Sequence, residues 1–334
     1  KLWSSITTDP YFINLHETRS LQQPNLLLCI RKNDSVLVYS IPEHTQISNR
    51  SNSSFKPIDL HHMKFPRDYS YFCSRQSVHG LICSQESRKP IIWNPSKRQF
   101  LTLPKPWRTG LFLGHDPIEG KYKVLCVPYK KTCYECRVLT LGSAQVSWKK
   151  GYTNAGRCIK GVIYYLATKG KTHEFVLMSF DVRSETLDTI GLPSVISFVT
   201  DIYSDKLINY RGRLACMDNS NGGRLWILVD AEKHKWSCQN FHSPLSYHDP
   251  SLRTFKLRGC TQAGELIYLP DKFHKPFEIL LCDPVRNSYR RFELKGITDS
   301  YRRFELKGIA DDHGGENNMY QIYAFPNHIE SMSL

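Results

Sequence analysis

The chain has 334 residues, of which 40% are apolar and 23% charged, and its formal net charge is +14 at pH 7. This composition is typical of a globular protein and argues against extended disorder, which goes with a lower apolar content. No segment approaches the ~20 consecutive apolar residues of a membrane-spanning helix, and the first residues predict no secretory signal.

The first predicted element is a short helix at the start of the chain. Leu2, Trp3 and Ile6 share one face of this helix, and the Asp9-Pro10 pair is expected to end it. The next apolar side chains are expected to be anchors on the core: Tyr11, Phe12 and Leu15. Beyond residue 20, no stretch of about 12 residues keeps a helical pattern without a Gly, Pro or Asn break.

From there the chain repeats one plan: a glycine, a short apolar strand, a polar hairpin, a second apolar strand, and Asn or Asp at a turn. The four clearest copies begin at Gly80, Gly161, Gly212 and Gly264. Asn and Asp suit the turn because their side chains accept backbone hydrogen bonds from residues further on. A third, more polar strand follows each turn.

Two weaker copies complete the series. Leu26–Ile30 is expected to pair with Val36–Ile41, and Tyr122–Val127 with Cys136–Leu141. The turns then lie near residues 42, 94, 142, 181, 230 and 283, in steps of 39 to 53 residues, the spacing of β-propeller blades. The predicted fold is all-β: a single propeller-like domain of about six four-stranded blades after a short N-terminal helix. A β-sandwich or two stacked barrels is the alternative.

Motifs at the start of the chain and around residues 79–125 also resemble a known family. Lys1–Ile6 with Asp9–Phe12 resembles the closing helix of a plant F-box. His79–Cys83, Ile92–Phe100 and Leu113–Leu125 resemble an F-box-associated β-propeller domain of type 3. The motif residues, expected to be structural, are Gly80, Leu81, Trp93, Asn94, Pro95, Asp116, Pro117, Tyr122 and Val124.

This resemblance implies residues 1–20 as the C-terminal remnant of an F-box helix and residues 21–334 as the propeller. It also implies a non-catalytic substrate receptor of a Skp–cullin–F-box E3 ubiquitin ligase, which holds the protein to be ubiquitinated. The adaptor-facing residues would be Leu2, Trp3, Ile6, Pro10 and Phe12.

In the family, the helices that make most of the adaptor contact would precede Lys1. We therefore expect the chain to be a fragment or a trimmed product, with a Skp-type adaptor and a cullin as partners when the full F-box is present. The alternative is a stand-alone propeller, without a ligase link, that binds protein, glycan or nucleic acid.

The basic residues are dispersed along the chain, which favours a basic surface over a nucleic-acid groove. The sequence names no protein substrate. Candidate contact residues lie in predicted loops and belong to residue types enriched among interface anchors: Trp107, Arg108, Tyr129 and Phe273.

No pattern predicts a catalytic, cofactor or metal site. Cys133 and Cys136 have half of a zinc-knuckle spacing, but a tetrahedral site needs two more ligands. His61-His62 lacks a metal-ligand spacing, and Asn219–Gly223 reads as a hairpin turn. The eleven cysteines are odd in number and unclustered, which favours reduced thiols in the cytoplasm or nucleus.

A tandem duplication lies near the end of the chain. Ser288–Asp299 and Ser300–Asp311 differ only at Thr298 against Ala310, and either copy could be the outer strand of the last blade. The second copy is then an enlarged binding loop or a neutral surface insertion. We favour the neutral insertion, which predicts that deleting Ser300–Asp311 shifts the melting temperature by no more than about two degrees.

Overall fold

The computed structural model of the chain describes residues 9–32, 35–43, 59–64, 76–84, 90–104, 109–128, 136–142, 146–149, 156–169, 174–194, 206–218, 223–245, 252, 254–271, 277–294 and 321–332. Within these residues it contains the helix α2 (Pro10–Gln22) and six four-stranded antiparallel sheets.

The sheets are the blades of a propeller, numbered here in chain order from blade 1. From the inner to the outer edge, blade 1 contains β24 (Gln321–His328), β1 (Asn25–Lys32), β2 (Ser35–Pro42) and β3 (Asp59–Lys64). Blade 2 contains β4 (Ser77–Val78), β5 (Leu81–Ser84), β6 (Ile91–Asn94) and β7 (Gln99–Thr102). Blade 3 contains β8 (Thr109–His115), β9 (Tyr122–Pro128), β10 (Cys136–Thr140) and β11 (Val146–Lys149).

In the same order, blade 4 contains β12 (Gly156–Ile159), β13 (Val162–Lys169), β14 (Glu174–Asp181) and β15 (Leu187–Ile190). Blade 5 contains β16 (Leu207–Tyr210), β17 (Arg213–Asp218), β18 (Arg224–Asp230) and β19 (Lys235–Asn240). Blade 6 contains β20 (Phe255–Cys260), β21 (Leu266–Pro270), β22 (Glu278–Asp283) and β23 (Ser288–Glu293).

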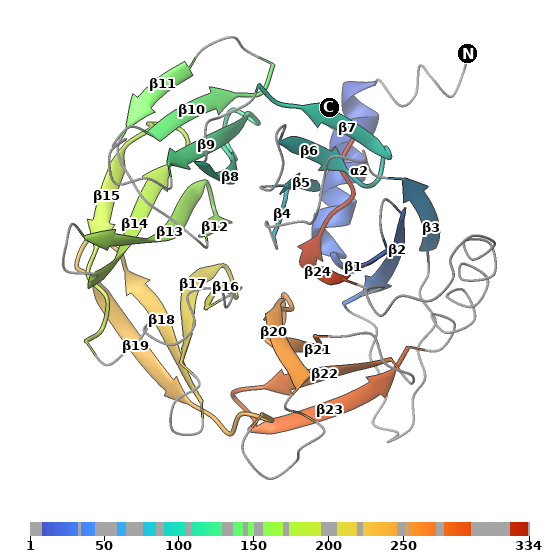
Figure 1. Cartoon of the computed structure of the whole chain (residues 1–334), viewed down its shortest axis with the longest axis vertical. Helices are drawn as coiled ribbons and strands as arrows, with labels where there is room; N and C mark the ends of the chain where they lie inside the picture. Colours follow the sequence, from blue (N-terminus) through green and yellow to red (C-terminus); the bar gives the residue numbers. More distant parts are fainter. Residues whose placement is uncertain are drawn as a thin grey trace, which may run out of the picture.

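The blades form a closed ring around a central axis (Figure 1). The innermost strand of each blade contacts the innermost strand of the next, and β24 contacts both β20 and β4. The six apolar clusters of the described residues each combine side chains from two neighbouring blades, including blades 6 and 1. The core is therefore divided among the blade interfaces, which confirms the predicted propeller of six blades.

Burial of both sheet faces explains the apolar runs in the sequence. Every residue of β21 is buried, as is every residue of β6, because these middle strands lie between two neighbouring blades. The outer strand β19 has four exposed residues out of six and carries the mostly polar sequence KWSCQN. Apolar middle strands and polar outer strands are what a ring of stacked sheets requires.

The C-terminal strand closes the ring. β24 pairs with β1 in an antiparallel register that places Ile322 opposite Ile30, so blade 1 combines the two ends of the domain. Ile322 and Ala324 pack against blade 6, whereas Tyr323 and Phe325 pack against blade 2. This long-range pairing was not predicted from the repeats.

Tight turns join the inner two strands of blades 2, 4 and 5. The pairs His79-Gly80, Lys160-Gly161 and Arg211-Gly212 have positive φ at both residues, the geometry of a two-residue type I′ turn. A glycine tolerates this backbone without steric cost, which explains the glycine that opens the repeated plan, just before the second strand of each of these blades. We call the face of the ring that carries these turns the turn face.

The predicted Asn and Asp turns are also confirmed. The Oδ1 atom of Asp181 accepts from the backbone N–H of Ser184 at 2.8 Å, and that of Asp283 from Val285 at 2.9 Å. In blades 4 and 6, such a hydrogen bond therefore stabilises the turn between the two outer strands.

Asp9-Pro10 begins the helix α2, which was not predicted: the Asp9 carboxylate accepts from the Tyr11 and Phe12 N–H groups, and Pro10 is at the first turn. Asp before Pro is a helix-start signal because proline has no N–H to leave unsatisfied there. The predicted helix before this pair lies outside the described residues, so its end at Asp9-Pro10 stays a prediction. Tyr11 and Leu15 are 77% and 58% exposed, so the prediction that they are core anchors was wrong.

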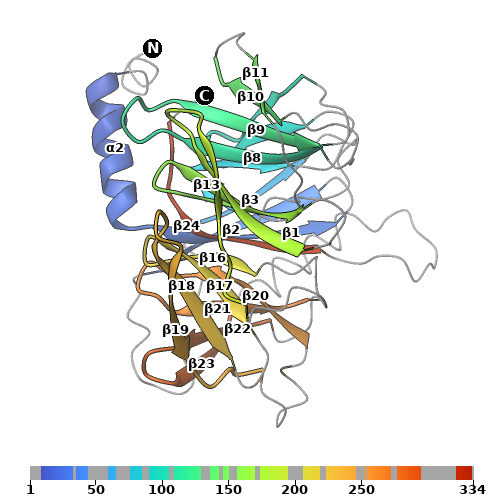
Figure 2. The ribbon, with the colours of Figure 1, turned by 90° about the vertical axis from the view of Figure 1, so that its left-hand side faces the viewer.

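α2 lies along one face of the ring (Figure 2). No helix in the described part of the chain is long and apolar enough to span a bilayer. The first copy of the duplication supplies β23, the outer strand of blade 6, and residues 295–311 with the second copy lie outside the described residues.

Candidate functional site

Motif residues of blade 2 hold the four residues that follow β24, here called the tail (residues 329–332). Gly80 lies directly against the tail: a Cβ atom at Gly80 would be 2.8 Å from the Ile329 carbonyl oxygen. The buried Asn94 donates from Nδ2 to the Ser331 carbonyl at 3.0 Å, and its Oδ1 accepts from the Lys97 N–H at 2.9 Å. The glycine and the asparagine of the motif therefore fix the tail on blade 2.

The helix α2 binds the same tail through polar contacts. Ser331 donates from Oγ to Glu17 Oε1 at 2.9 Å, and the Met332 N–H donates to the same oxygen at 3.2 Å. The Glu330 N–H donates to Ser20 Oγ at 2.6 Å. The tail thus links α2 to the turn face of blade 2.

Other motif residues join blades 2, 3 and 4. The Tyr122 hydroxyl donates to the His79 carbonyl at 2.8 Å, and the His79 and His115 rings stack with centroids 3.9 Å apart. Pro117 packs on Gly161 of blade 4, where a Cβ atom would be 2.9 Å from Pro117 Cδ.

The remaining motif residues lie inside the molecule. Leu81, Trp93 and Val124 are fully buried in the core, and Pro95 is buried at the turn after β6. Asp116 is 1% exposed and accepts from the Ile118 N–H at 2.9 Å. Together the motif residues build the core and the turn face and offer little surface to a partner.

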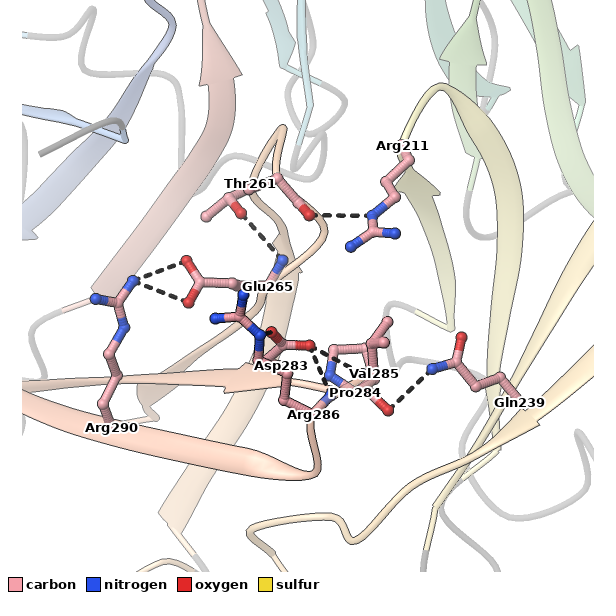
Figure 3. Close-up of polar contacts among 10 residues, drawn as sticks. Arg211, Gln239, Thr261, Glu265, Asp283, Pro284, Val285, Arg286 and Arg290 are labelled. Carbon is pink, nitrogen blue, oxygen red and sulfur yellow. Dashed lines mark hydrogen bonds and ion pairs between the residues drawn. The ribbon is translucent and has the colours of Figure 1, made fainter. Parts of the chain in front are cut away.

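Polar contacts between neighbouring turns continue around the turn face to blades 5 and 6 (Figure 3). Arg211 Nε donates to the Ala263 carbonyl at 3.0 Å, and Gln239 Nε2 donates to the Pro284 carbonyl at 2.9 Å. Within blade 6, Arg290 Nη2 contacts both carboxylate oxygens of Glu265, at 2.8 and 2.9 Å. The first two bonds join blades 5 and 6, and the third joins β23 to the residue before β21.

A cavity of about 200 Å³ lies at the turn-face end of the central channel. All six innermost strands, or the turns that follow them, contribute to its wall. Gln76 bridges two of these blades, since its amide donates to the Cys158 carbonyl at 2.6 Å and accepts from the Cys158 N–H at 2.7 Å.

The charged groups of the cavity wall are basic. Arg157 and Arg258 are 6% and 4% exposed, and Lys160 lies at the exposed turn between β12 and β13. Arg258 Nη2 donates to Asp271 Oδ1 at 3.2 Å. No Asp or Glu of the described residues lines the cavity.

The two stacked imidazoles of the wall are neutral at pH 7. Burial lowers the pKa of His79, against the opposing effect of Glu17. Burial, followed by the neighbouring His79, lowers the pKa of His115 to about 4, despite Asp116. The cavity therefore owes its positive charge to arginine and lysine.

Several predicted site residues cannot be placed. Leu2, Trp3 and Ile6 lie outside the described residues, as do the contact candidates Trp107, Arg108, Tyr129 and Phe273. Of the other adaptor-facing candidates, Pro10 is the first residue of α2 and Phe12 is half-buried on it.

The described cysteines are free thiols, and most are buried. Cys133 lies outside the described residues, whereas Cys136 is fully buried on β10, where burial raises the pKa of its thiol to about 12. His61 and His62 are adjacent on β3. Among the described residues, no group of three or more His, Cys, Asp or Glu side chains could hold a metal ion.

The family model for the F-box associated beta propeller domain matches residues 25–329, which is the whole ring from β1 to the start of the tail. The chain belongs to this family. The repeated glycine, the Asn and Asp turns and the closing strand β24 all lie within the residues that match the family model.

Relatives in Arabidopsis thaliana align over nearly the whole chain. The protein named "Putative F-box protein At1g47790" is 47% identical over 99% of this chain and 87% of its own length. "Putative F-box protein At3g10240" is 49% identical over 99% of this chain and 86% of its own length. "F-box protein At1g48060" is 35% identical over 99% of this chain and 86% of its own length.

Among solved structures, TolB from Acinetobacter baumannii aligns with 91% of this chain and 67% of its own, at a TM-score of 0.49 and 9% identity. This likeness is too weak to inform function.

Sequence reasoning missed the basic cavity and the contact between α2 and the tail. Arg157 and Arg258 stand in mostly apolar inner strands, GRCI and FKLRGC, and an arginine in such a strand was the available signal. Their convergence depends on ring closure and cannot be read from either strand alone.

Proposed function

We propose that the chain is the substrate-recognition module of a Skp–cullin–F-box E3 ubiquitin ligase and has no catalytic role. The observation that carries this proposal is the family match across the ring, together with relatives named as F-box proteins along 99% of the chain. In such a receptor the F-box docks on a Skp-type adaptor and the propeller holds the protein to be ubiquitinated.

The contact between α2 and the tail supports this role. In the proposal, residues 1–20 end the F-box and residues 21–334 form the propeller, with Leu2, Trp3 and Ile6 facing the adaptor. Because Glu17 and Ser20 bind the tail, α2 has a defined position on the turn face. A substrate on the ring would then be presented to the ligase in a fixed orientation.

The proposed compartment is the cytoplasm or the nucleus. The described cysteines are free thiols, and seven of the nine are buried. Reduced, unpaired cysteines are typical of proteins kept in a reducing compartment.

Affinity purification of the full-length protein from plant cells tests the ligase role. We expect a Skp-type adaptor and a cullin to co-purify with it. Replacing Leu2, Trp3 and Ile6 together by alanine should reduce adaptor recovery at least tenfold. Val285→Ala is the matched control, because Val285 is a 56% exposed apolar residue on blade 6 and should leave recovery unchanged.

Recovery of neither adaptor nor cullin from the unmodified protein would overturn the ligase role and leave a stand-alone binding propeller. The net charge of +14 makes nucleic acid the first ligand to test in that case. A mobility shift with RNA or DNA that weakens steeply with salt would support it.

A further inference from the structure

The cavity at the turn-face end of the channel has the features of a small ligand site. Its volume is about 200 Å³, and its wall is contributed by the innermost strands or turns of all six blades. Pro117 and Lys160 belong to the wall and are exposed, so the cavity is open to solvent among the turns.

Three basic residues line the cavity, one exposed and two buried. Lys160 lies at the exposed turn after β12, and the buried Arg157 precedes it by three residues, with its Nη1 donating to the Gly156 carbonyl at 3.0 Å. Arg258 comes from β20, in blade 6, and is 4% exposed. Arg258 forms an ion pair with Asp271, a carboxylate that is outside the cavity wall and whose side chain is 57% exposed.

The neutral groups of the wall do not reverse this charge. His79 and His115 stack at 3.9 Å and stay uncharged at pH 7, because burial lowers the pKa of both. The amide of Asn327 donates to the Cys260 carbonyl at 2.8 Å, and Asn209 accepts from the Gly212 N–H at 3.0 Å. The ligand preference of the cavity is therefore set by the guanidinium groups of Arg157 and Arg258 and the ammonium group of Lys160.

The size of the cavity limits the ligand. Its volume of about 200 Å³ is below the ~300 Å³ of ordinary drug-sized pockets, so it suits a small group better than a drug-sized ligand. A phosphate group matches guanidinium donors in both charge and geometry.

We propose that this cavity binds a single phosphate group, held by Arg157 and Arg258 with Lys160 at the mouth. The phosphate could come from a free small molecule or from a phosphorylated side chain of a bound protein. The proposal is independent of the ligase role, since binding is measured on the protein alone without adaptor or cullin.

Titration with inorganic phosphate at constant ionic strength tests the site. We expect a saturable rise in melting temperature and a calorimetric isotherm with one site. Lys160→Asn should weaken the affinity about fivefold, since an exposed charge-assisted bond is lost. This variant keeps the turn intact, because Asn-Gly is a preferred type I′ pair.

Two further variants keep the test decisive. Arg157→Lys retains the positive charge but loses the planar guanidinium with its paired N–H donors, and should weaken phosphate binding about tenfold. Lys233→Gln is the matched control: Lys233 is on a turn of blade 5, its side chain is 79% exposed, and it lies outside the cavity. Equal affinity in all variants, or no saturable binding, would show only a diffuse response of a basic surface and would overturn the proposal.

The source of the phosphate is decided by competition. The probe is the capped peptide Gly-Gly-phosphoserine-Gly-Gly, with the unphosphorylated peptide as its control. Competition by the phosphopeptide alone supports a modified protein side chain as the ligand. Binding of inorganic phosphate that neither peptide displaces supports a free small molecule.

Discussion

At the scale of single residues, Gly80 shows how one position can hold a distant segment. Its φ of +81° disfavours other residues, and an added Cβ atom would be 2.8 Å from the Ile329 carbonyl oxygen. We predict that Gly80→Ala destabilises the protein by about 2–3 kcal/mol, from backbone strain and displacement of the tail. Urea unfolding followed by circular dichroism measures this.

Gly120→Ala separates the two causes. Gly120 also has a positive φ, of +67°, but an added Cβ atom would meet nothing within 4 Å. This variant should therefore cost only the backbone strain, about 1 kcal/mol. Equal losses for the two variants would contradict a specific role of Gly80 in seating the tail.

The buried imidazole of His328 makes stability depend on pH. His328 Nδ1 is 2.9 Å from Ser77 Oγ, and burial lowers the pKa of His328 to about 4 from an ordinary value of 6.5. The unfolded chain thus binds a proton between pH 6.5 and 4 that the folded chain does not, so stability falls as pH falls through this window. The expected loss is about 1.4 kcal/mol per pH unit, or about 3 kcal/mol near pH 4.

The comparison with His328→Asn isolates this proton. Asparagine keeps an acceptor near the Ser77 hydroxyl but does not titrate, so other groups contribute equally to both proteins. The stability advantage of the natural protein should shrink from pH 7 to pH 4. Parallel curves of unfolding free energy against pH would contradict the assignment.

At the scale of elements, polar bonds to the tail fix the position of α2. Glu17 Oε1 accepts two hydrogen bonds from the tail, while Tyr11 and Leu15 face outward. We predict that Glu17→Ala loosens α2 by about 1–2 kcal/mol and leaves the global unfolding midpoint almost unchanged. Hydrogen exchange of the α2 amides and tryptic cleavage after the exposed Arg19 report the loosening.

Thr18→Ala is the control on the same helix. Thr18 is exposed and bonds only Asn14 of α2, at 3.2 Å. Its replacement should leave exchange and cleavage close to those of the natural protein. A similar rise in both variants would mean that α2 frays for reasons unrelated to the tail.

At the scale of the whole molecule, local sequence signals predicted the blades, whereas the contacts between residues far apart in the chain were not predicted. The turn pairs such as Lys160-Gly161 and the carboxylates such as Asp181 act within a few residues, so the sequence predicts their hairpins directly. The contact between Glu17 and Ser331 joins residues 314 positions apart, and no local pattern encodes it. The same reason hides the basic cavity, which exists only when all six blades meet.

The start of α2 at Asp9-Pro10 was missed for a different reason. Proline disfavours a preceding helix and favours a following one, and the prediction used only the first effect, whereas α2 starts at this pair. Asp9 as the N-cap was the local signal for the helix that follows.

Ring closure leads to a prediction with two truncations. Ending the chain after residue 320 removes β24, and with it Ile322 and Phe325 from the clusters on either side of blade 1. We expect this chain to lose cooperative unfolding, because blade 1 keeps three strands and both of its interfaces are opened. Ending the chain after His328 removes only the tail contacts, so the ring should still unfold cooperatively, about 2–4 kcal/mol less stable.

Calorimetry and urea unfolding distinguish the two chains. The shorter one should show no sharp thermal transition, whereas the longer one should keep the denaturant dependence of the natural protein with a lower midpoint. A cooperative transition in the chain that ends after residue 320 would show that the ring does not depend on β24. Loss of cooperativity in both would place the closure in the tail and its contacts with Gly80 and Asn94, not in the pairing of β24 with β1.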